Sequence, residues 1–274
     1  MTSVASVIVP TRNSQRTLRA CLESIRAQTV PVELVVVDNG SSDQTAEIAR
    51  ELADVVLDVG PERSAQRNAG ARAARSDRLL FVDSDMVLAP DVVEAALATN
   101  APAVVIPEES FGEGFWARCK ALERSCYLGD DTIEAARLFS RELFFAIGGY
   151  DEEIVMGCED WDLDARAKAA GARIARAKTT IRHDEGRLRL RRSTAKKFHY
   201  GRSLVRYVRK HPALARRQIR LVRPAFVRHR GRLARQPLLT AGIVVMKCAE
   251  FGAFGAGAAT AMLRGFRRQP GAGA

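Results

Sequence analysis

Two carboxylates separated by one residue, Asp83 and Asp85, come directly after an apolar run at residues 79–82. Alternate residues at the end of a strand point the same way, so both carboxylates are expected to face one hard cation. Mg²⁺ or Mn²⁺, held by one or two carboxylates and by substrate phosphates, is the usual arrangement for nucleotide chemistry. A solvated acidic turn is the alternative, and the position after a buried run favours the cation site.

A second group of acids, headed by Glu159 and Asp160, comes at the expected start of a helix over residues 159–170. The helix dipole favours acids in a first turn, which accounts for their presence without any catalytic role. It does not account for the preceding glycines or for the bulky Trp161. A carboxylate at a helix N-terminus is held ionised, which suits a general base.

Short apolar runs alternate with amphipathic stretches through the first two-thirds of the chain. Strands are expected at residues 4–9, 33–37, 55–59, 79–82 and 103–106, and helices at residues 13–28, 43–52, 64–75, 90–99 and 115–127. Strands joined by helices of this length form βαβ units, which predicts an α/β fold with a mostly parallel sheet. Ligands bind beyond the carboxyl ends of such strands, where Thr11, Asp38 and Asp83 are expected.

Several classes of protein are disfavoured. The turn Pro10-Thr11-Arg12-Asn13 has no glycine, whereas a dinucleotide-binding domain needs glycines there so that the backbone can approach a pyrophosphate. The five cysteines are scattered and include no CxxC pair, which argues against a disulfide framework and favours a reducing compartment. The first residues lack the features of a signal peptide, so a cytoplasmic location is expected.

Five segments stand in order: VIVPTRN, VVVDNGSSDQT, ERSAQRNAG, FVDSD, and GGYDE followed by EDWDLDAR. Together they resemble the family-2 inverting glycosyltransferases of the GT-A fold, over about residues 4–185. The resemblance implies a Rossmann-like, mostly parallel sheet flanked by helices, and a nucleotide-sugar donor. It also implies a divalent cation, Mg²⁺ or Mn²⁺, as the cofactor.

The resemblance implies roles for single residues. Asp160 resembles the catalytic base, and Glu159 is expected to bind the acceptor or to orient that base. Asp85 is expected to ligate the metal, with Asp83 on the ribose or on a metal-bound water. His183 is expected to be a further metal or diphosphate ligand, with a structural histidine as the alternative. The residues expected to bind the donor are Pro10, Thr11, Asn13, Asp38, Arg67, Asp83, Ser84 and Arg141.

The implied reaction is an in-line attack of an acceptor hydroxyl on the anomeric carbon as a nucleoside diphosphate leaves. Asp160 would take the hydroxyl proton, a role worth roughly 10²–10⁴-fold in rate. The cation at Asp85 would offset the charge that builds on the diphosphate. The carboxylates of Asp83, Asp85 and Asp160, from two distant segments, are therefore expected to converge around the leaving group. If the acceptor is a polyprenyl phosphate, its oxygen is already ionised and no base is needed. The sequence does not indicate the sugar, the nucleotide or the acceptor.

Residues 107–137 depart from the simplest pattern of that family. Apolar residues there, including Phe115 and Trp116, predict an amphipathic helix that packs on the sheet edge. A lid or an acceptor-side wall is the alternative. Asp131, in the loop that follows, and Trp161 are expected on the acceptor side of the site.

The charge is divided unevenly along the 274 residues. Residues 1–185 carry 21 Lys and Arg against 31 Asp and Glu, whereas residues 186–274 carry 22 against the single acid Glu250. We therefore expect a catalytic domain over residues 1–185 and a basic, helical tail over residues 186–274. Such a tail indicates an anionic partner, either a membrane surface or a nucleic acid. Nothing in the body indicates nucleic-acid chemistry, so the membrane is favoured.

An apolar stretch at residues 237–263 is about as long as a membrane span, although Lys247 and Glu250 interrupt it and are spaced to pair on one helix face. We interpret it as a membrane-associated helix or re-entrant hairpin. A full span, a helix packed on the catalytic domain and a homodimer contact are the alternatives. With the basic segment, it would hold a peripheral or monotopic enzyme on the inner face of the cell membrane, beside a lipid-linked or polysaccharide acceptor. The competing functions are a non-catalytic nucleotide-sugar-binding protein and a nucleic-acid-binding protein.

Overall fold

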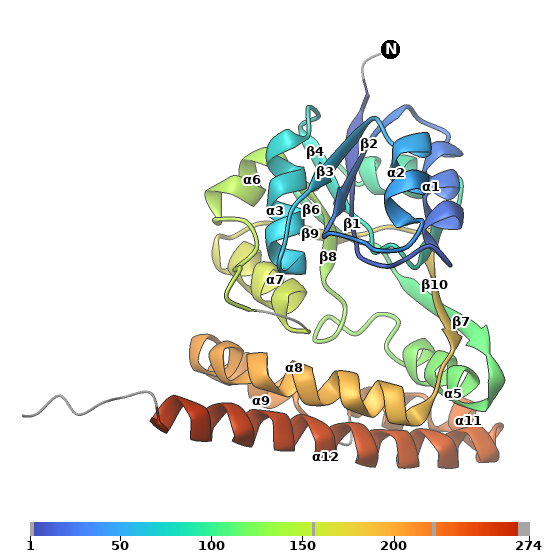
Figure 1. The fold of residues 1–274 in the computed structure, drawn as a ribbon. Helices are drawn as coiled ribbons and strands as arrows, with labels where there is room; N and C mark the ends of the chain where they lie inside the picture. Colours follow the sequence, from blue (N-terminus) through green and yellow to red (C-terminus); the bar gives the residue numbers. More distant parts are fainter. Residues whose placement is uncertain (1–2, 155–156, 221–222, 268–274) are drawn as a thin grey trace, which may run out of the picture.

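The computed structural model describes residues 3–154, 157–220 and 223–267. Its main sheet has seven strands in the order β3-β2-β1-β4-β8-β6-β9 (Figure 1). Four of the neighbouring pairs are parallel, and β8 is antiparallel to both of its neighbours. The predicted α/β fold with a mostly parallel sheet is confirmed. The strands are β1 Ala5–Thr11, β2 Val32–Asp38, β3 Val55–Asp58, β4 Arg78–Phe81, β6 Ala103–Val105, β8 Ala136–Ser140 and β9 Ile174–Arg176.

Helices cover both faces of the main sheet because its central strands are apolar on both faces. Val7 of β1 packs with Leu22 of α1 in one core. The next residue, Ile8, packs with Ala71 of α3 in the core on the other face. Gly70 of α3 lies so close that an added Cβ would be 2.5 Å from the Ile8 Cγ2 atom. The helices of these two layers are α1 Leu18–Arg26, α2 Thr45–Leu52, α3 Arg63–Ala73, α4 Val92–Leu97, α6 Arg141–Ala146 and α7 Glu159–Ala169.

A second sheet has three strands in the order β5-β10-β7 and was not predicted. β5 spans Met86–Leu88, β7 spans Glu108–Glu113 and β10 spans Ile181–Arg187. β10 is antiparallel to β5 and parallel to β7. In Figure 1, β7 and β10 run from the main sheet down to the helices at the bottom of the molecule.

Helices α8 to α12, which we call the C-terminal layer, lie at the bottom of Figure 1. α8 (Leu190–Lys210) and α12 (Pro237–Arg267) lie side by side, and α5 (Gly114–Ser125) packs against α12. α5 was expected to pack on the sheet edge, and it contacts β7, the edge strand of the second sheet, as well as α12. β10 crosses the boundary expected at residues 185–186, and the division into domain and tail stays a prediction. The short helices are α9 Pro212–Gln218, α10 Pro224–Arg228 and α11 Arg230–Ala234.

Glycines let α12 approach its partner helices closely. A Cβ on Gly257 of α12 would lie 2.0 Å from the carbonyl oxygen of Phe198 in α8. One on Gly201 of α8 would lie 2.0 Å from the carbonyl oxygen of Phe254 in α12. Gly242 meets side chains of α5 in the same way. Because only glycine fits such contacts, this helix is built to pack on the rest of the chain, which was one of the alternatives for residues 237–263.

Charged side chains are buried between α5 and α12, and we call them the buried ionic network. Lys247 Nζ lies 2.6 Å from Glu123 Oε1 and 3.6 Å from Glu250 Oε2, so the predicted pair of Lys247 and Glu250 is confirmed. Lys120 lies 3.0 Å from Glu123, and Ser193 of α8 donates to Glu250. Burial would raise the pKa of Glu123, but Lys120 and Lys247 outweigh it and hold that pKa well below its ordinary value.

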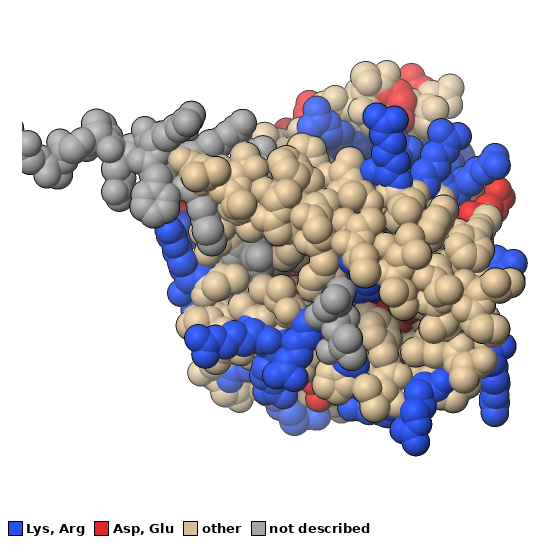
Figure 2. Space-filling view, turned by 90° about the horizontal axis from the view of Figure 1, so that it is seen from below, with Lys and Arg blue, Asp and Glu red and all other residues tan. Residues whose placement is uncertain are grey.

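The opposite face of α12 is apolar and exposed, and we call it the apolar ridge. Its side chains are exposed by 79% at Leu238, 58% at Val244, 51% at Val245 and 67% at Leu263. Figure 2 shows this side of the molecule as a tan band with Lys and Arg on both sides. By length and composition alone, the segment Pro237–Ala261 is long and apolar enough to cross a membrane, and a third of its most apolar window is buried inside the protein.

Candidate active site

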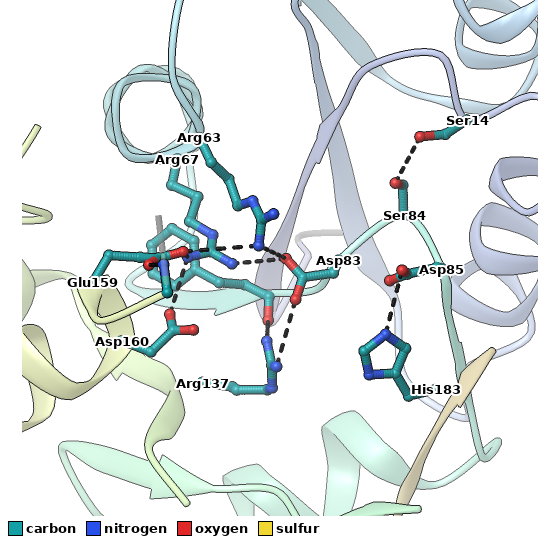
Figure 3. Close-up of polar contacts among 12 residues, drawn as sticks. Ser14, Arg63, Arg67, Asp83, Ser84, Asp85, Arg137, Glu159, Asp160 and His183 are labelled. Carbon is teal, nitrogen blue, oxygen red and sulfur yellow. Dashed lines mark hydrogen bonds and ion pairs between the residues drawn. The ribbon is translucent and has the colours of Figure 1, made fainter. Parts of the chain in front are cut away.

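Arg67 of α3 lies at the centre of the site and is fully buried (Figure 3). Its Nη2 donates to Asp83 Oδ1 at 2.7 Å, and its Nη1 donates to Asp160 Oδ1 at 3.0 Å. Asp83 follows β4, whereas Asp160 lies in the first turn of α7. The prediction that carboxylates from these two distant segments converge is therefore confirmed.

Asp83 is surrounded by guanidinium groups. Besides Arg67, Arg137 of β8 lies 3.5 Å from Asp83 Oδ2, and Arg63 of α3 lies 3.9 Å from Asp83 Oδ1. Burial would raise the pKa of Asp83, but these three arginines hold it well below its ordinary value. Asp83 is therefore ionised at neutral pH, and both of its oxygens face protein cations.

Asp85 faces His183 of β10, away from those arginines (Figure 3). His183 Nε2 lies 3.3 Å from Asp85 Oδ2, and its Nδ1 lies 3.8 Å from the Glu108 carboxylate of β7. Residues 83–85 form a turn between β4 and β5 instead of extending the strand. This turn gives Asp83 and Asp85 different partners, and the expectation that both carboxylates face one cation stays a prediction.

The chemistry of Asp85 and His183 fits a divalent cation. The Asp85 side chain is 39% exposed, and His183 Nδ1 is buried without a hydrogen-bond partner in the described residues. Burial would lower the pKa of His183, but Asp85 and Glu108 raise it to about 10. A cation that binds the imidazole would therefore displace a proton, because only the neutral ring ligates a metal. Within the described ranges, no three His, Cys, Asp or Glu side chains form a metal site. The pair therefore suits Mg²⁺ or Mn²⁺ that keeps substrate phosphates among its ligands.

The adjacent acids of α7 have different surroundings. The Asp160 side chain is 35% exposed, and its Oδ1 also accepts a hydrogen bond from the Tyr150 hydroxyl at 3.3 Å. Glu159 is buried, accepts from the backbone N–H of Gly157 and lies 3.6 Å from Arg67 Nη1. Of the two expected roles for Glu159, its burial beside Arg67 fits the orientation of Asp160 and not the binding of an acceptor.

The expected nucleotide edge lies at the carboxyl ends of β1 and β2, where Thr11 and Asp38 are neighbours in register. Thr11 Oγ1 is buried and has no hydrogen-bond partner in the described part of the chain. Asp38 accepts from the backbone N–H and the hydroxyl of Ser41. Pro10 is buried inside β1. The orphaned hydroxyl of Thr11 is thus a group that a ligand at this edge would satisfy.

Asn13 and Ser84 connect this edge to the Asp83–Asp85 turn. Asn13 has a positive φ of 49°, and its side-chain oxygen accepts from the backbone N–H of Ser42 at 2.9 Å. The Ser84 hydroxyl lies 2.9 Å from that of Ser14 (Figure 3). Hydrogen bonds therefore connect the loops after β1 and β2 with the turn after β4.

Arg141 was expected at the donor phosphates, and the structure corrects this. β8 is antiparallel to β4, which places Arg141 beside Asp77, before the start of β4 and at the end of the sheet opposite to Asp83. Its guanidinium donates to the carbonyl oxygens of Ala71 and Ala74 at 3.2 and 2.7 Å. Arg141 thus stabilises the C-terminus of α3.

The two residues expected on the acceptor side lie near α7. Trp161 donates from Nε1 to the carbonyl oxygen of Ile133 at 2.9 Å, and its ring packs against Tyr207 of α8. Asp131 is exposed, and its carbonyl oxygen accepts from Lys168 at 3.4 Å. Trp161 therefore joins α7 to α8 and to the loop before β8, and the acceptor-side role of both residues stays a prediction.

Sequence reasoning missed several residues of the site. Arg137 holds Asp83 and is itself bound by Glu108, with Nη2 2.5 Å from Oε1. Neither residue belongs to one of the five sequence segments, and nothing local marks them as partners. Tyr200 of α8 lies over Gly157, where an added Cβ would be 2.7 Å from its ring. Tyr150, by contrast, stands inside the GGYDE segment, which was a usable signal.

Comparison with known proteins identifies the family to which the chain is similar. A family model for glycosyl transferase family 2 matches residues 6–128. Succinoglycan biosynthesis protein ExoA of Rhizobium meliloti (strain 1021) is 31% identical over 242 residues, which cover 78% of this chain and 73% of that protein.

Two solved structures share the fold. Mannosyltransferase PcManGT from Pyrobaculum calidifontis, in complex with GDP-Man and Mn²⁺, is 20% identical to this chain, with a TM-score of 0.56. The match covers 97% of this chain and 76% of PcManGT. Residues 1–349 of S. aureus TarS, in complex with UDP, are 18% identical, with a TM-score of 0.52. That match covers 95% of this chain and 91% of the TarS chain. With this fold, this site and this similarity to ExoA, the chain belongs to glycosyl transferase family 2 and is an enzyme that transfers sugars.

Proposed function

We propose that this protein is a metal-dependent inverting glycosyltransferase that moves a sugar from a nucleotide-sugar to a lipid-linked or cell-envelope glycan. The observation that carries the proposal is the position of Arg67 between Asp83 and Asp160. One buried guanidinium holds the carboxylate of the donor side and the carboxylate of the acceptor side in a fixed relation.

On the donor side, the nucleotide lies along the ends of β1 and β2, against Thr11 and Asp38. Asp85 and His183 would hold a divalent cation, which would supply positive charge against the charge that develops on the leaving diphosphate. PcManGT, which shares the fold, is in complex with GDP-Man and Mn²⁺, and this supports both a nucleotide-sugar donor and a divalent cation.

On the acceptor side, Asp160 is the general base. Arg67 and Tyr150 donate to its Oδ1, which leaves Oδ2 to take the proton of the acceptor hydroxyl. The oxygen so formed attacks the anomeric carbon from the side opposite the diphosphate, so the configuration inverts. The alternative is a polyprenyl-phosphate sugar synthase, in which an ionised phosphate oxygen attacks and no base is needed.

The C-terminal layer places the enzyme on the inner face of the cell membrane. The apolar ridge of α12 enters the lipid surface, and the Lys and Arg around it pair with anionic headgroups, each worth about 1 kcal/mol. The buried ionic network favours a helix that lies on the membrane, because a span would separate Lys247 from Glu123. The alternative is that the ridge forms a homodimer contact. Analytical ultracentrifugation without lipid distinguishes the two, because only a homodimer contact gives a dimer there.

The proposal is tested by thermal unfolding with UDP, GDP, ADP, CDP and dTDP in the presence of Mn²⁺. One of them should stabilise the protein by about 2.7 kcal/mol at 100 times its dissociation constant. Asp85→Ala should lose the part of this effect that depends on Mn²⁺. Stabilisation by none of the five, in a protein that is folded, would overturn the proposal.

A further inference from the structure

A hollow of about 330 Å³ lies where α5 and α8 begin. Its walls come from the last residue of β7 and the first turn of α5 on one side, and from the end of β10 and the start of α8 on the other. The lining residues are Glu113, Gly114, Phe115, Trp116, Arg187, Leu188, Arg189 and Leu190. None of them belongs to the site described above.

The lining combines cations with apolar side chains. Arg187 and Arg189 are exposed, and neither forms an ion pair with any residue that the structure describes. Glu113 is the only acid of the lining, so the two guanidinium groups leave a net positive charge. Phe115, 44% exposed, and Trp116 supply an aromatic wall. Such a surface suits a ligand that carries an anionic group next to a hydrocarbon chain.

The hollow lies between the active site and the apolar ridge. Arg187 comes four residues after His183 on β10, a distance of at most about 13 Å along an extended strand. On the other side, Phe115 packs over Gly242 of α12, and Leu238, one helical turn earlier on the ridge, is exposed. A lipid that leaves the membrane along the ridge therefore meets the hollow before it reaches the site.

We propose that this hollow binds the diphosphate of a lipid-linked acceptor, with Arg187 and Arg189 on the phosphates and Phe115 and Trp116 on the first part of the lipid chain. The inference rests on the proposed function and makes its acceptor more specific. Since Arg187 in the hollow lies four positions beyond His183 on β10, we infer that a sugar lies between the diphosphate and the reacting hydroxyl. The acceptor is thus a lipid diphosphate that already carries a sugar, and not a bare polyprenyl phosphate.

The experiment measures the binding of geranylgeranyl diphosphate to the full-length protein in detergent, by calorimetry, with EDTA present to disable the cation site. Arg187→Gln/Arg189→Gln should weaken this binding at least tenfold. The matched control, Arg191→Gln/Arg192→Gln, removes the same charge from exposed positions of α8 and should change binding less than twofold. Arg187→Lys/Arg189→Lys keeps the charge and should retain most of the affinity.

Inorganic diphosphate and geranylgeraniol test the two halves of the ligand, and each should bind at least tenfold more weakly than geranylgeranyl diphosphate. Equal loss of affinity in both Gln pairs would show general attraction to a basic surface and overturn the proposal. Inorganic diphosphate that binds as tightly as the lipid would overturn it as well. Nucleoside diphosphate binding with Mn²⁺ is measured on the same variants and should not change. If wild-type protein binds no nucleoside diphosphate, the proposed function fails. The comparison of the two double Gln variants still tests whether the hollow binds the lipid diphosphate.

Discussion

Two of the regions that bury charges in this molecule use them differently. At the active site, Arg67 holds Asp83 and Asp160, and Asp160 stays 35% exposed at the surface of the site. In the buried ionic network, Glu123 and Lys247 are both enclosed and face only each other and their neighbours. The first arrangement positions a carboxylate and leaves it accessible for chemistry, whereas the second fixes one helix against another.

The comparison also explains part of the uneven charge of the chain. Lys210 of α8 lies 3.0 Å from Asp151 and 2.7 Å from Asp162, and His211 lies 2.8 Å from Asp162. Some of the basic residues after 186 therefore neutralise acids of the preceding part. Other Lys and Arg side chains lie on both sides of the apolar ridge, as Figure 2 shows.

The largest expected effect concerns the active site. Asp160→Asn should lower turnover by roughly 10²–10⁴-fold, because the amide cannot accept the hydroxyl proton. Binding of the nucleoside diphosphate with Mn²⁺, measured by thermal shift, should persist. Glu142→Gln, an exposed acid of α6, is the control and should keep wild-type turnover. Full activity of Asp160→Asn would remove this residue as the base and favour an ionised phosphate acceptor.

The next effect concerns the buried ionic network. Lys247→Met should lower the free energy of unfolding by about 3–5 kcal/mol, because Glu123 and Glu250 lose a shared cation in a buried place. Chemical denaturation measures this loss. Lys178→Met, at an exposed position, should change stability by less than about 0.5 kcal/mol. A small effect at position 247 would mean that the network does not hold α12 in place.

A third prediction concerns Glu108, which binds Arg137 and faces His183. With Glu108→Gln, His183 should lose the carboxylate that faces its Nδ1 and orients the imidazole for a metal at Nε2. Mn²⁺ affinity should fall by about tenfold, or 1.4 kcal/mol. Electron paramagnetic resonance of free Mn²⁺ measures it. Glu109→Gln changes the next residue of β7, which is exposed, and should leave the affinity unchanged.

The smallest effect compares two glycines of α12. Gly257→Ala should destabilise the protein, because the new Cβ would lie 2.0 Å from a carbonyl oxygen of α8. Gly252→Ala, where nothing lies within 4 Å of the new Cβ, should stabilise it by about 0.5–1 kcal/mol, since alanine favours the helix. Thermal unfolding of the two variants should therefore shift in opposite directions. Shifts of the same sign would contradict the close packing of α8 and α12.

The sequence was sufficient to predict the parallel strands and the polar groups at their ends, because the runs at residues 4–9 and 33–37 are long, apolar and β-branched. It was also sufficient to predict that Asp83 and Asp160 meet. It could not predict which side chains neutralise them, because Arg137 and Glu108 reach the site through β8 and β7, strands without a clear apolar pattern.

The position of Arg141 shows a further limit. Its place depends on β8 being antiparallel to β4, and strand direction is a property of the whole sheet that no local pattern carries. The pairing of the C-terminal layer with the rest of the chain was hidden for a related reason. The sequence does not indicate whether a lysine is buried or exposed, because burial depends on how the helices pack in the folded chain.

Arg67 has a consequence for how the enzyme can change. A guanidinium is planar and presents its N–H groups at fixed angles, so the two acids it binds cannot be repositioned one at a time. New donor or acceptor preferences are therefore more easily gained at the rims of the site than at this central cation.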